Sequence, residues 1–277
     1  MKSLRHIPEK EQLAEEMQMF IVDDGIRLNA KLDYPAETRE KYPLVIVFHG
    51  FTGHMEERHI TAVSQMLNEI GCATLRVDMY GHGGSDGSFE KHTLYKWLTN
   101  ALSVIDFAKK LENISELYLC GHSQGGLTVM LAGAMEHDII KGIIPMSPAI
   151  NIPDDARNGS ILGCRFNPER IPESITSDNG WSLNGNYIRV AQTIHVEDAI
   201  EKYRGPVCLV HGAKDDTIPM QCSIKAHHAY SNAELTIIPD DTHCYDFHLD
   251  MAVKVVKDWM KRQLDVQNNE EPKQKNR

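Results

Sequence analysis

The stretch Leu117-Tyr-Leu-Cys-Gly-His-Ser-Gln-Gly-Gly126 decides the fold of this chain. It passes from a short apolar segment, typical of a buried strand, through Gly-x-Ser-x-Gly into helical spacing at 124–136. A serine on so tight a turn needs a strained backbone, and side chains two positions to either side would collide with neighbouring backbone. Gly121 and Gly125 remove those side chains. The sequence therefore predicts a strand–turn–helix unit that presents Ser123 as a nucleophile near a helix N-terminus.

Strands and helices alternate on both sides of this turn. A hairpin is predicted over 17–34, with Asp23-Asp24-Gly25 as its turn. Apolar runs predict strands at 43–48, 73–77, 117–120, 139–146, 206–210 and 235–238. Helical spacing predicts helices at 59–70, 91–111, 124–136 and 246–264. This alternation predicts an α/β fold with a mostly parallel sheet flanked by helices.

The alternation is interrupted once, at residues 147–205, which are rich in Pro, Asn, Gly and Asp. Unstructured loops of that length are uncommon inside compact domains. A disordered linker is the alternative, but Trp181 and a helical stretch at 187–200 give this segment apolar residues to pack. We therefore predict an inserted cap (lid) over the active site. The predicted division is an N-terminal arm at 1–16, a core at 17–146 and 206–264, the cap at 147–205, and a disordered tail at 265–277.

The composition of the chain limits the kinds of binding partner and the cellular compartment that we expect. The formal charge of −10 argues against nucleic acid or an anionic membrane surface, because phosphate binding needs clustered Lys and Arg. No stretch reaches the ~18 apolar residues of a membrane helix. The 6 cysteines show no Cys-x-x-Cys spacing, which predicts free thiols in a reducing compartment. We expect a cytoplasmic protein that acts on a small molecule without metal or cofactor, and a homodimer is compatible with the sequence.

A second glycine-containing motif, His49-Gly-Phe-Thr-Gly53, follows the strand predicted at 43–48. In a fold of this kind, such a loop supplies one backbone amide to an oxyanion hole, and the residue after the nucleophile supplies the other. The predicted donors are therefore the amides of Phe51 and Gln124. We interpret His49 as a structural residue that braces the loop.

The remaining catalytic residues follow the last two strands. The segment His211-Gly-Ala-Lys-Asp-Asp-Thr-Ile-Pro219 carries two adjacent aspartates, and its spacing favours Asp215 as the acid, leaving Asp216 as a turn residue. Of the 14 histidines, His243 is the one placed in a strand-end loop after that acid. Ser123, Asp215 and His243 therefore form the predicted nucleophile, acid and base, in the chain order typical of this arrangement.

With these motifs in order, the chain resembles the α/β-hydrolase superfamily over about residues 17–264, and more narrowly the bacterial cinnamoyl (feruloyl) esterases. The segments that carry the resemblance are His49–Gly53, Gly81–Gly87, Gly121–Gly126 and Asp241–Tyr245, with Ser147–Ala149, Asn167–Pro172 and Asn186–Gln192 in the cap.

The resemblance implies a serine esterase that hydrolyses hydroxycinnamate esters and holds the aromatic acyl part with the cap. In similar enzymes an aspartate and a tyrosine of the cap bind the phenolic substituents, and the matching positions here are Asp155 and Tyr187, with Asp154 as a competitor. Leu162 stands where some relatives have glutamine, which leaves the phenolic preference open. A general carboxylesterase or monoacylglycerol lipase-like hydrolase, a serine peptidase or acyltransferase, and a non-enzymatic binding protein are the alternatives.

Overall fold

The computed structural model describes residues 16–274, so the predicted N-terminal arm lies outside the described residues except for Glu16. Its centre is an eight-stranded sheet in the order β1-β2-β4-β3-β5-β6-β11-β12. β2 runs antiparallel to both of its neighbours, and the other adjacent pairs are parallel. The strands are β1 Glu16–Asp23, β2 Ile26–Asp33, β3 Tyr42–Phe48, β4 Ala73–Val77, β5 Ile114–His122, β6 Ile140–Met146, β11 Val207–Gly212 and β12 Ala233–Ile238. The predicted mostly parallel sheet is confirmed.

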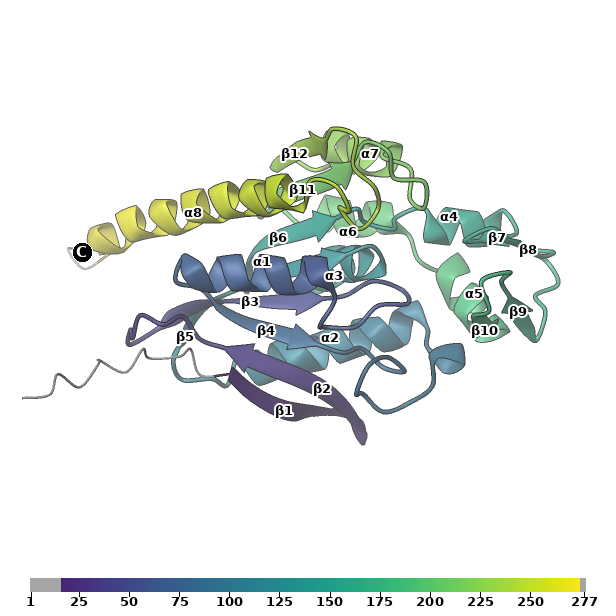
Figure 1. The fold of residues 1–277 in the computed structure, drawn as a ribbon, viewed down its shortest axis with the longest axis horizontal. Coiled ribbons are helices and arrows are strands. Elements are labelled where there is room, and N and C mark those ends of the chain that lie inside the picture. Colours follow the sequence, from purple (N-terminus) through teal and green to yellow (C-terminus); the bar gives the residue numbers. More distant parts are fainter. Residues whose placement is uncertain (1–15, 275–277) are drawn as a thin grey trace, which may run out of the picture.

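Helices cover both faces of the sheet (Figure 1). The central strand β3 shows why, because its side chains from Leu44 to Phe48 are apolar and point alternately to either face. Leu44, Ile46 and Phe48 join the core beneath one helical layer, whereas Val45 and Val47 join a second core beneath the other. The first layer holds α2 Leu94–Ala108, α3 Gln124–Met135 and α7 Gln221–Ala229; the second holds α1 Arg58–Glu69 and α8 Leu249–Gln274.

The parallel strands β3, β5, β6, β11 and β12 all end at one edge of the sheet. In an open α/β sheet, ligands bind beyond the carboxyl ends of the strands. The loops after β3, β5, β11 and β12 are those to which the sequence assigned the oxyanion hole, the nucleophile, the acid and the base. The topology therefore gathers these four segments at one edge.

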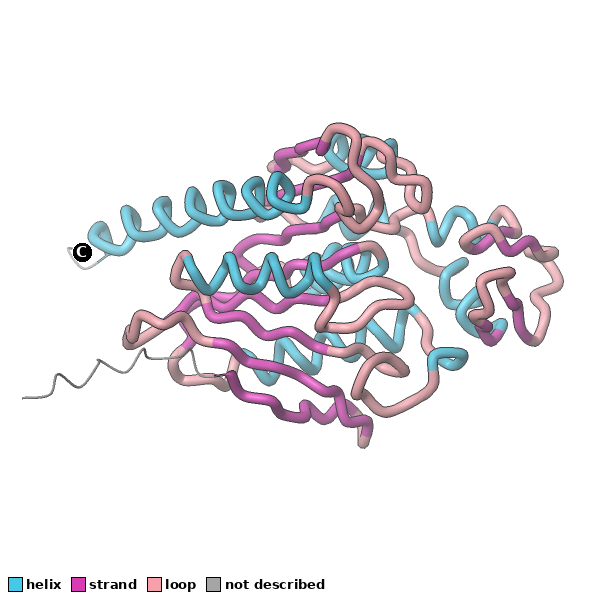
Figure 2. The backbone as a smooth tube through the Cα atoms, in the orientation of Figure 1, coloured by secondary structure: helices cyan, strands magenta, loops and turns pink. Residues whose placement is uncertain are grey.

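The segment between β6 and β11 projects beyond this edge (Figure 1) and contains long loops between short elements (Figure 2). The helical stretch predicted at 187–200 is two helices, and the last of them, α6, packs against α3 of the core. The elements of this inserted segment are α4 Ile152–Arg157, β7 Ser160–Ile161, β8 Cys164–Arg165, β9 Ser174–Thr176, β10 Ser182–Asn184, α5 Gly185–Gln192 and α6 Val196–Lys202.

The closing helix differs from its predicted length. α8 continues past residue 264 to Gln274, where a disordered tail was expected. Among the described helices, none is both long and apolar enough to cross a membrane.

Candidate active site

Ser123 sits on a strained turn between β5 and α3. Its backbone angles are φ 56° and ψ −117°, a region that side-chain-bearing residues rarely occupy. A Cβ atom at Gly121 would lie 2.2 Å from the carbonyl oxygen of Gly125, and one at Gly125 would lie 2.4 Å from that of His49. Both glycines are therefore required by close backbone contacts, as the sequence predicts.

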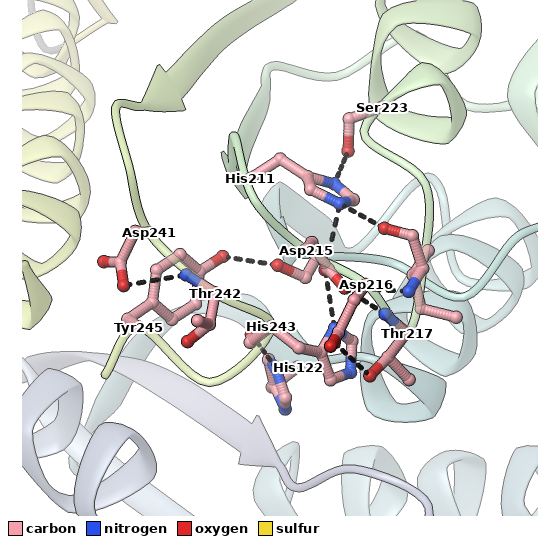
Figure 3. Close-up of polar contacts among 12 residues, drawn as sticks. His122, His211, Asp215, Asp216, Thr217, Ser223, Asp241, Thr242, His243 and Tyr245 are labelled. Atoms are coloured by element: carbon pink, nitrogen blue, oxygen red, sulfur yellow. Dashed lines mark hydrogen bonds and ion pairs between the residues drawn. The ribbon is translucent and has the colours of Figure 1, made fainter. Parts of the chain in front are cut away.

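Asp215 lies in the loop after β11, and its side chain is buried. One carboxylate oxygen accepts hydrogen bonds from the backbone amides of Thr217 and Ile218, at 3.0 and 2.8 Å. The other faces His243 Nδ1 at 2.6 Å and His211 Nε2 at 3.1 Å (Figure 3). The structure thus joins the predicted acid to the predicted base.

This environment keeps Asp215 ionised. Burial alone would raise the pKa of Asp215, but hydrogen bonds from His211 and His243 hold that pKa well below its usual range. A buried carboxylate in contact with Nδ1 orients the imidazole and stabilises its cation, which is what a catalytic acid does behind a histidine base. Asp216 lines the pocket and accepts a hydrogen bond from the Thr217 hydroxyl at 3.3 Å. Asp216 makes no hydrogen bond to His243 among the described residues.

His211 is a supporting residue to which the sequence analysis assigned no function. Its Nδ1 contacts Ser223 Oγ at 2.7 Å, and its Nε2 lies between Asp215 and the carbonyl oxygen of Ile218 (Figure 3). The signal was present in the sequence, because His211 stands four residues before Asp215 in the same strand-end motif.

A second histidine links the nucleophile turn to the base. His122, next to Ser123, is buried, and its Nε2 donates a hydrogen bond of 2.8 Å to the backbone carbonyl of His243 (Figure 3). Burial and the neighbouring histidine His59 lower the pKa of His122 well below its usual value, so the ring is neutral. One neutral ring carries one N–H, and here that hydrogen points at the loop that holds the base.

Ser123 and His243 line one pocket, but no hydrogen bond joins the serine hydroxyl to the imidazole among the described residues. The structure therefore brings the acid and base into contact, and the nucleophile and base into a shared cavity. Hydrogen bonds at catalytic sites are often long in ligand-free structures and shorten when substrate binds.

The two predicted oxyanion donors lie beside the nucleophile. Gln124 is the first residue of α3, where backbone amides have no acceptor within the helix. Phe51 lines the pocket together with Ser123. Its backbone amide has no hydrogen-bond acceptor within residues 16–274, and its carbonyl contacts His82 Nε2 at 2.5 Å. Two such amides beside a nucleophile suit an oxyanion.

The pocket has a volume of about 1090 Å³ and extends from the sheet edge to the inserted segment. Asp155 lies on its wall, whereas Asp154 is exposed and pairs with Arg157 at 2.7 Å. Tyr187 is not part of the lining. It is fully buried, and its hydroxyl donates to the side chain of Gln124. The pocket wall from the inserted segment is formed by Ala149, Asn151, Ile152, Asp155, Leu162, Gly163, Asn179 and Trp181.

A buried acid–histidine pair that shares a pocket with a serine on a strained strand–turn–helix unit defines a serine hydrolase of the α/β-hydrolase fold. The sequence profile of the hydrolase family described as serine aminopeptidase, S33, matches residues 39–182. The chain belongs to this family within the α/β-hydrolase superfamily, which confirms the predicted fold class, superfamily and class of enzyme.

Individual solved structures and one sequence relative show which proteins this chain is similar to. Est1E from Butyrivibrio proteoclasticus with ferulic acid bound is 57% identical, with a TM-score of 0.88 over 89% of this chain and 99% of that one. The mitochondrial palmitoyl-protein thioesterase ABHD10 of Homo sapiens is 24% identical over 72% of this chain, and the match spans 65% of that protein's length. Mouse ABHD10 shares the fold, with a TM-score of 0.74 at 19% identity over 89% of this chain and 99% of that one.

Proposed function

We propose that this protein is a serine ester hydrolase that cleaves esters of hydroxycinnamic acids. The observation that carries the proposal is the match to Est1E, whose structure contains bound ferulic acid, over almost the whole length of that chain. The site geometry supports it, because Ser123 and His243 share a pocket with the inserted segment.

The proposed mechanism is a two-step acyl transfer. Ser123 attacks the ester carbonyl while His243 accepts its proton, and the amides of Phe51 and Gln124 stabilise the oxyanion. His243 then protonates the departing alcohol. Water attacks the acyl-enzyme in the same way and releases the acid. Asp215 remains ionised throughout and stabilises the imidazolium.

The pocket suits an aromatic acyl group. Ile152, Leu162 and Trp181 supply apolar surface, and Asp155 supplies a carboxylate beside them. Burial raises the pKa of Asp155, which is opposed by a hydrogen bond from Asn151 at 2.8 Å. We assign the contact with the phenolic substituent to Asp155, since Tyr187 does not reach the pocket wall in this conformation. The inserted segment then acts as the predicted cap.

A panel of substrates tests the proposal. We expect turnover of methyl ferulate to exceed that of a monoacylglycerol and of a peptide amide by at least about tenfold in kcat/KM, a difference of about 1.4 kcal/mol in transition-state binding. A p-nitrophenyl ester should give a burst of chromophore, with Ser123→Ala as the inactive control. Faster cleavage of the monoacylglycerol would make the protein a lipase-like hydrolase, and faster cleavage of the amide a peptidase.

We also propose a cytoplasmic location. The 6 cysteines are all free thiols, and burial raises the pKa of Cys72 and of Cys120 to about 12. Disulfides are rare in reducing compartments, and the six unpaired cysteines suit such a location. Fractionation of the source cells with an antibody to this chain tests the location.

A further inference from the structure

The oxyanion hole is in contact with a buried residue of the inserted segment, Tyr187 of α5. Its hydroxyl donates a 2.6 Å hydrogen bond to Gln124 Oε1, and both side chains are fully buried. Gln124 belongs to the core, at the start of α3, and its amide is one of the two proposed oxyanion donors. A side chain of the insertion therefore holds the residue that follows the nucleophile.

This hydrogen bond is what orients the Gln124 side chain. Gln124 Nε2 and His92 Nε2 are both buried, and neither has a hydrogen-bond partner of ordinary geometry among the described residues. Burial lowers the pKa of His92 to about 3, and the neighbouring Gln124 side chain acts in the opposite direction and raises it. Without the tyrosine hydroxyl, the side-chain carboxamide of Gln124 would have no well-formed hydrogen bond in a site that excludes water.

The second oxyanion residue touches the same tyrosine. The ring of Phe51 packs edge-to-face against Tyr187, with centroids 6.0 Å apart, and against Trp181 at 5.2 Å. Tyr187 also contacts the ring of His92 at 5.1 Å. Phe51 lies in the loop after β3 and Gln124 lies at the start of α3, and Tyr187 contacts both.

We propose that Tyr187 is a positioning residue, whose hydroxyl fixes Gln124 and whose ring backs Phe51, so that the inserted segment builds the oxyanion hole. The inference rests on the proposed function of the Phe51 and Gln124 amides. It gives Tyr187 a function different from the phenol contact that the family resemblance implies. Donors of an oxyanion hole act only when they are aimed at the developing charge, so a loosened donor lowers kcat more than substrate binding.

The variant Tyr187→Phe separates the two functions, since it removes the hydroxyl and keeps the ring. If Tyr187 is a positioning residue, kcat of the variant should fall about tenfold, equally for methyl ferulate and methyl cinnamate. KM should change less than about twofold. Direct binding of the phenol predicts a higher KM for methyl ferulate, while methyl cinnamate, which lacks the phenol, is unaffected. The second pattern overturns the proposal.

A matched control removes another hydroxyl between the core and the insertion. Tyr95 of α2 contacts Thr193 Oγ1, at the end of α5, at 2.8 Å on the protein surface. Tyr95→Phe should leave kcat and KM unchanged, because this bond does not reach Phe51 or Gln124. An equal loss in Tyr95→Phe would show that any weakened contact of the insertion lowers activity, and would overturn the proposal.

A double-mutant cycle reaches the bond from its other end. Gln124→Met keeps the volume and the backbone amide but removes the acceptor. The losses in Tyr187→Phe and Gln124→Met should not add in the double variant, whereas additive losses would contradict the inference. If Tyr187→Phe fails to fold, Gln124→Met carries the same test of kcat against KM.

The wild-type rate with p-nitrophenyl acetate separates this inference from the substrate proposal. If the protein cleaves the acetate but neither cinnamate ester, the proposed substrate class is wrong. The variants are then compared on the acetate, which still tests the position of Gln124.

Discussion

The edge of the sheet and the inserted segment contribute to one pocket but follow different structural rules. At the sheet edge, each proposed catalytic group lies in the turn or loop that follows a strand, and its position follows from parallel strands ending together. In the insertion, Asp155, Trp181 and Tyr187 are placed by packing between short elements. The chemistry is therefore specified locally in the sequence, while the wall around the substrate depends on tertiary contacts.

The largest effect should come from the sheet edge. Ser123→Ala removes the nucleophile, and kcat should fall by about 10⁴-fold or more, because the members of a triad act as a unit. The melting temperature should stay the same or rise, since the strained backbone at position 123 is unchanged. Steady-state rates with methyl ferulate and thermal unfolding measure both quantities. Substantial remaining turnover would remove Ser123 from the mechanism.

Replacing a glycine by alanine should lower the free energy of unfolding more at the sheet edge than in the insertion. Gly125→Ala places a Cβ atom 2.4 Å from one backbone oxygen and 2.6 Å from another, so the free energy of unfolding should fall by about 3 kcal/mol or more. Gly180→Ala, in the insertion, meets nothing within 4 Å, and its cost should be limited to about 1–2 kcal/mol from the positive φ of 87°. Urea unfolding of both variants compares them. Equal losses would mean that the turn at Gly125 is less crowded than the structure shows.

Acid should weaken the core through its buried histidines. Burial lowers the pKa of His59 to about 4, so the folded protein resists protonation that the unfolded chain accepts below its ordinary value of about 6.5. Because the unfolded state then binds more protons, stability falls as pH drops from 6.5 toward 4. The depressed pKa of Asp215 acts in a different window, since its contribution persists until pH falls below the ordinary range of an aspartate.

His59→Phe tests this assignment. We expect the variant to lose roughly 1 kcal/mol less stability than the wild type between pH 7.5 and 5.5, from the linkage of about 1.4 kcal/mol per pH unit. His195→Gln, at an exposed position of the insertion, is the control and should behave like the wild type. Urea unfolding at the two pH values measures the difference, and parallel losses in all three proteins would argue against the buried histidine.

The smallest effect concerns which of two adjacent aspartates in the insertion contacts the substrate. Asp155→Asn should raise KM for methyl ferulate by about threefold to tenfold, because it weakens a charged contact with the phenol worth about 1 kcal/mol. Asp154→Asn should have no effect on KM, since Asp154 is exposed and pairs with Arg157. Methyl cinnamate serves as the substrate without a phenol. A change in KM for Asp154→Asn alone would reverse the assignment of the two aspartates.

Sequence patterns predicted the strands and the turns of the sheet edge for a physical reason. Buried strands have continuous apolar runs, and the turns after them need particular residues, such as Gly121 and Gly125, whose absence would cause clashes. Asp215 could be preferred to Asp216 from motif spacing alone. The hydrogen bond from His211 to this acid was not predicted, because it depends on the loop folding back over its own strand.

The position of the insertion along the chain could be predicted from the sequence, but its helix bounds and side-chain contacts could not. The helix predicted at 187–200 is divided into α5 and α6, and α6 packs against α3 of the core. Tyr187 was assigned to the pocket by resemblance, yet its hydroxyl contacts Gln124. No local pattern marks a buried hydrogen bond between residues 63 positions apart. Such contacts appear only when tertiary packing is known.

The convergence of Ser123 and His243 is tested most directly by covalent labelling. A p-nitrophenyl phosphonate ester is incubated with the enzyme, and the adduct is located by intact mass and peptide mapping. We expect one adduct per chain, on Ser123, forming at least about 10²-fold more slowly in His243→Ala because the hydroxyl loses its general base. An adduct on another residue, or labelling of Ser123 at the wild-type rate in His243→Ala, would contradict the assignment of the active site.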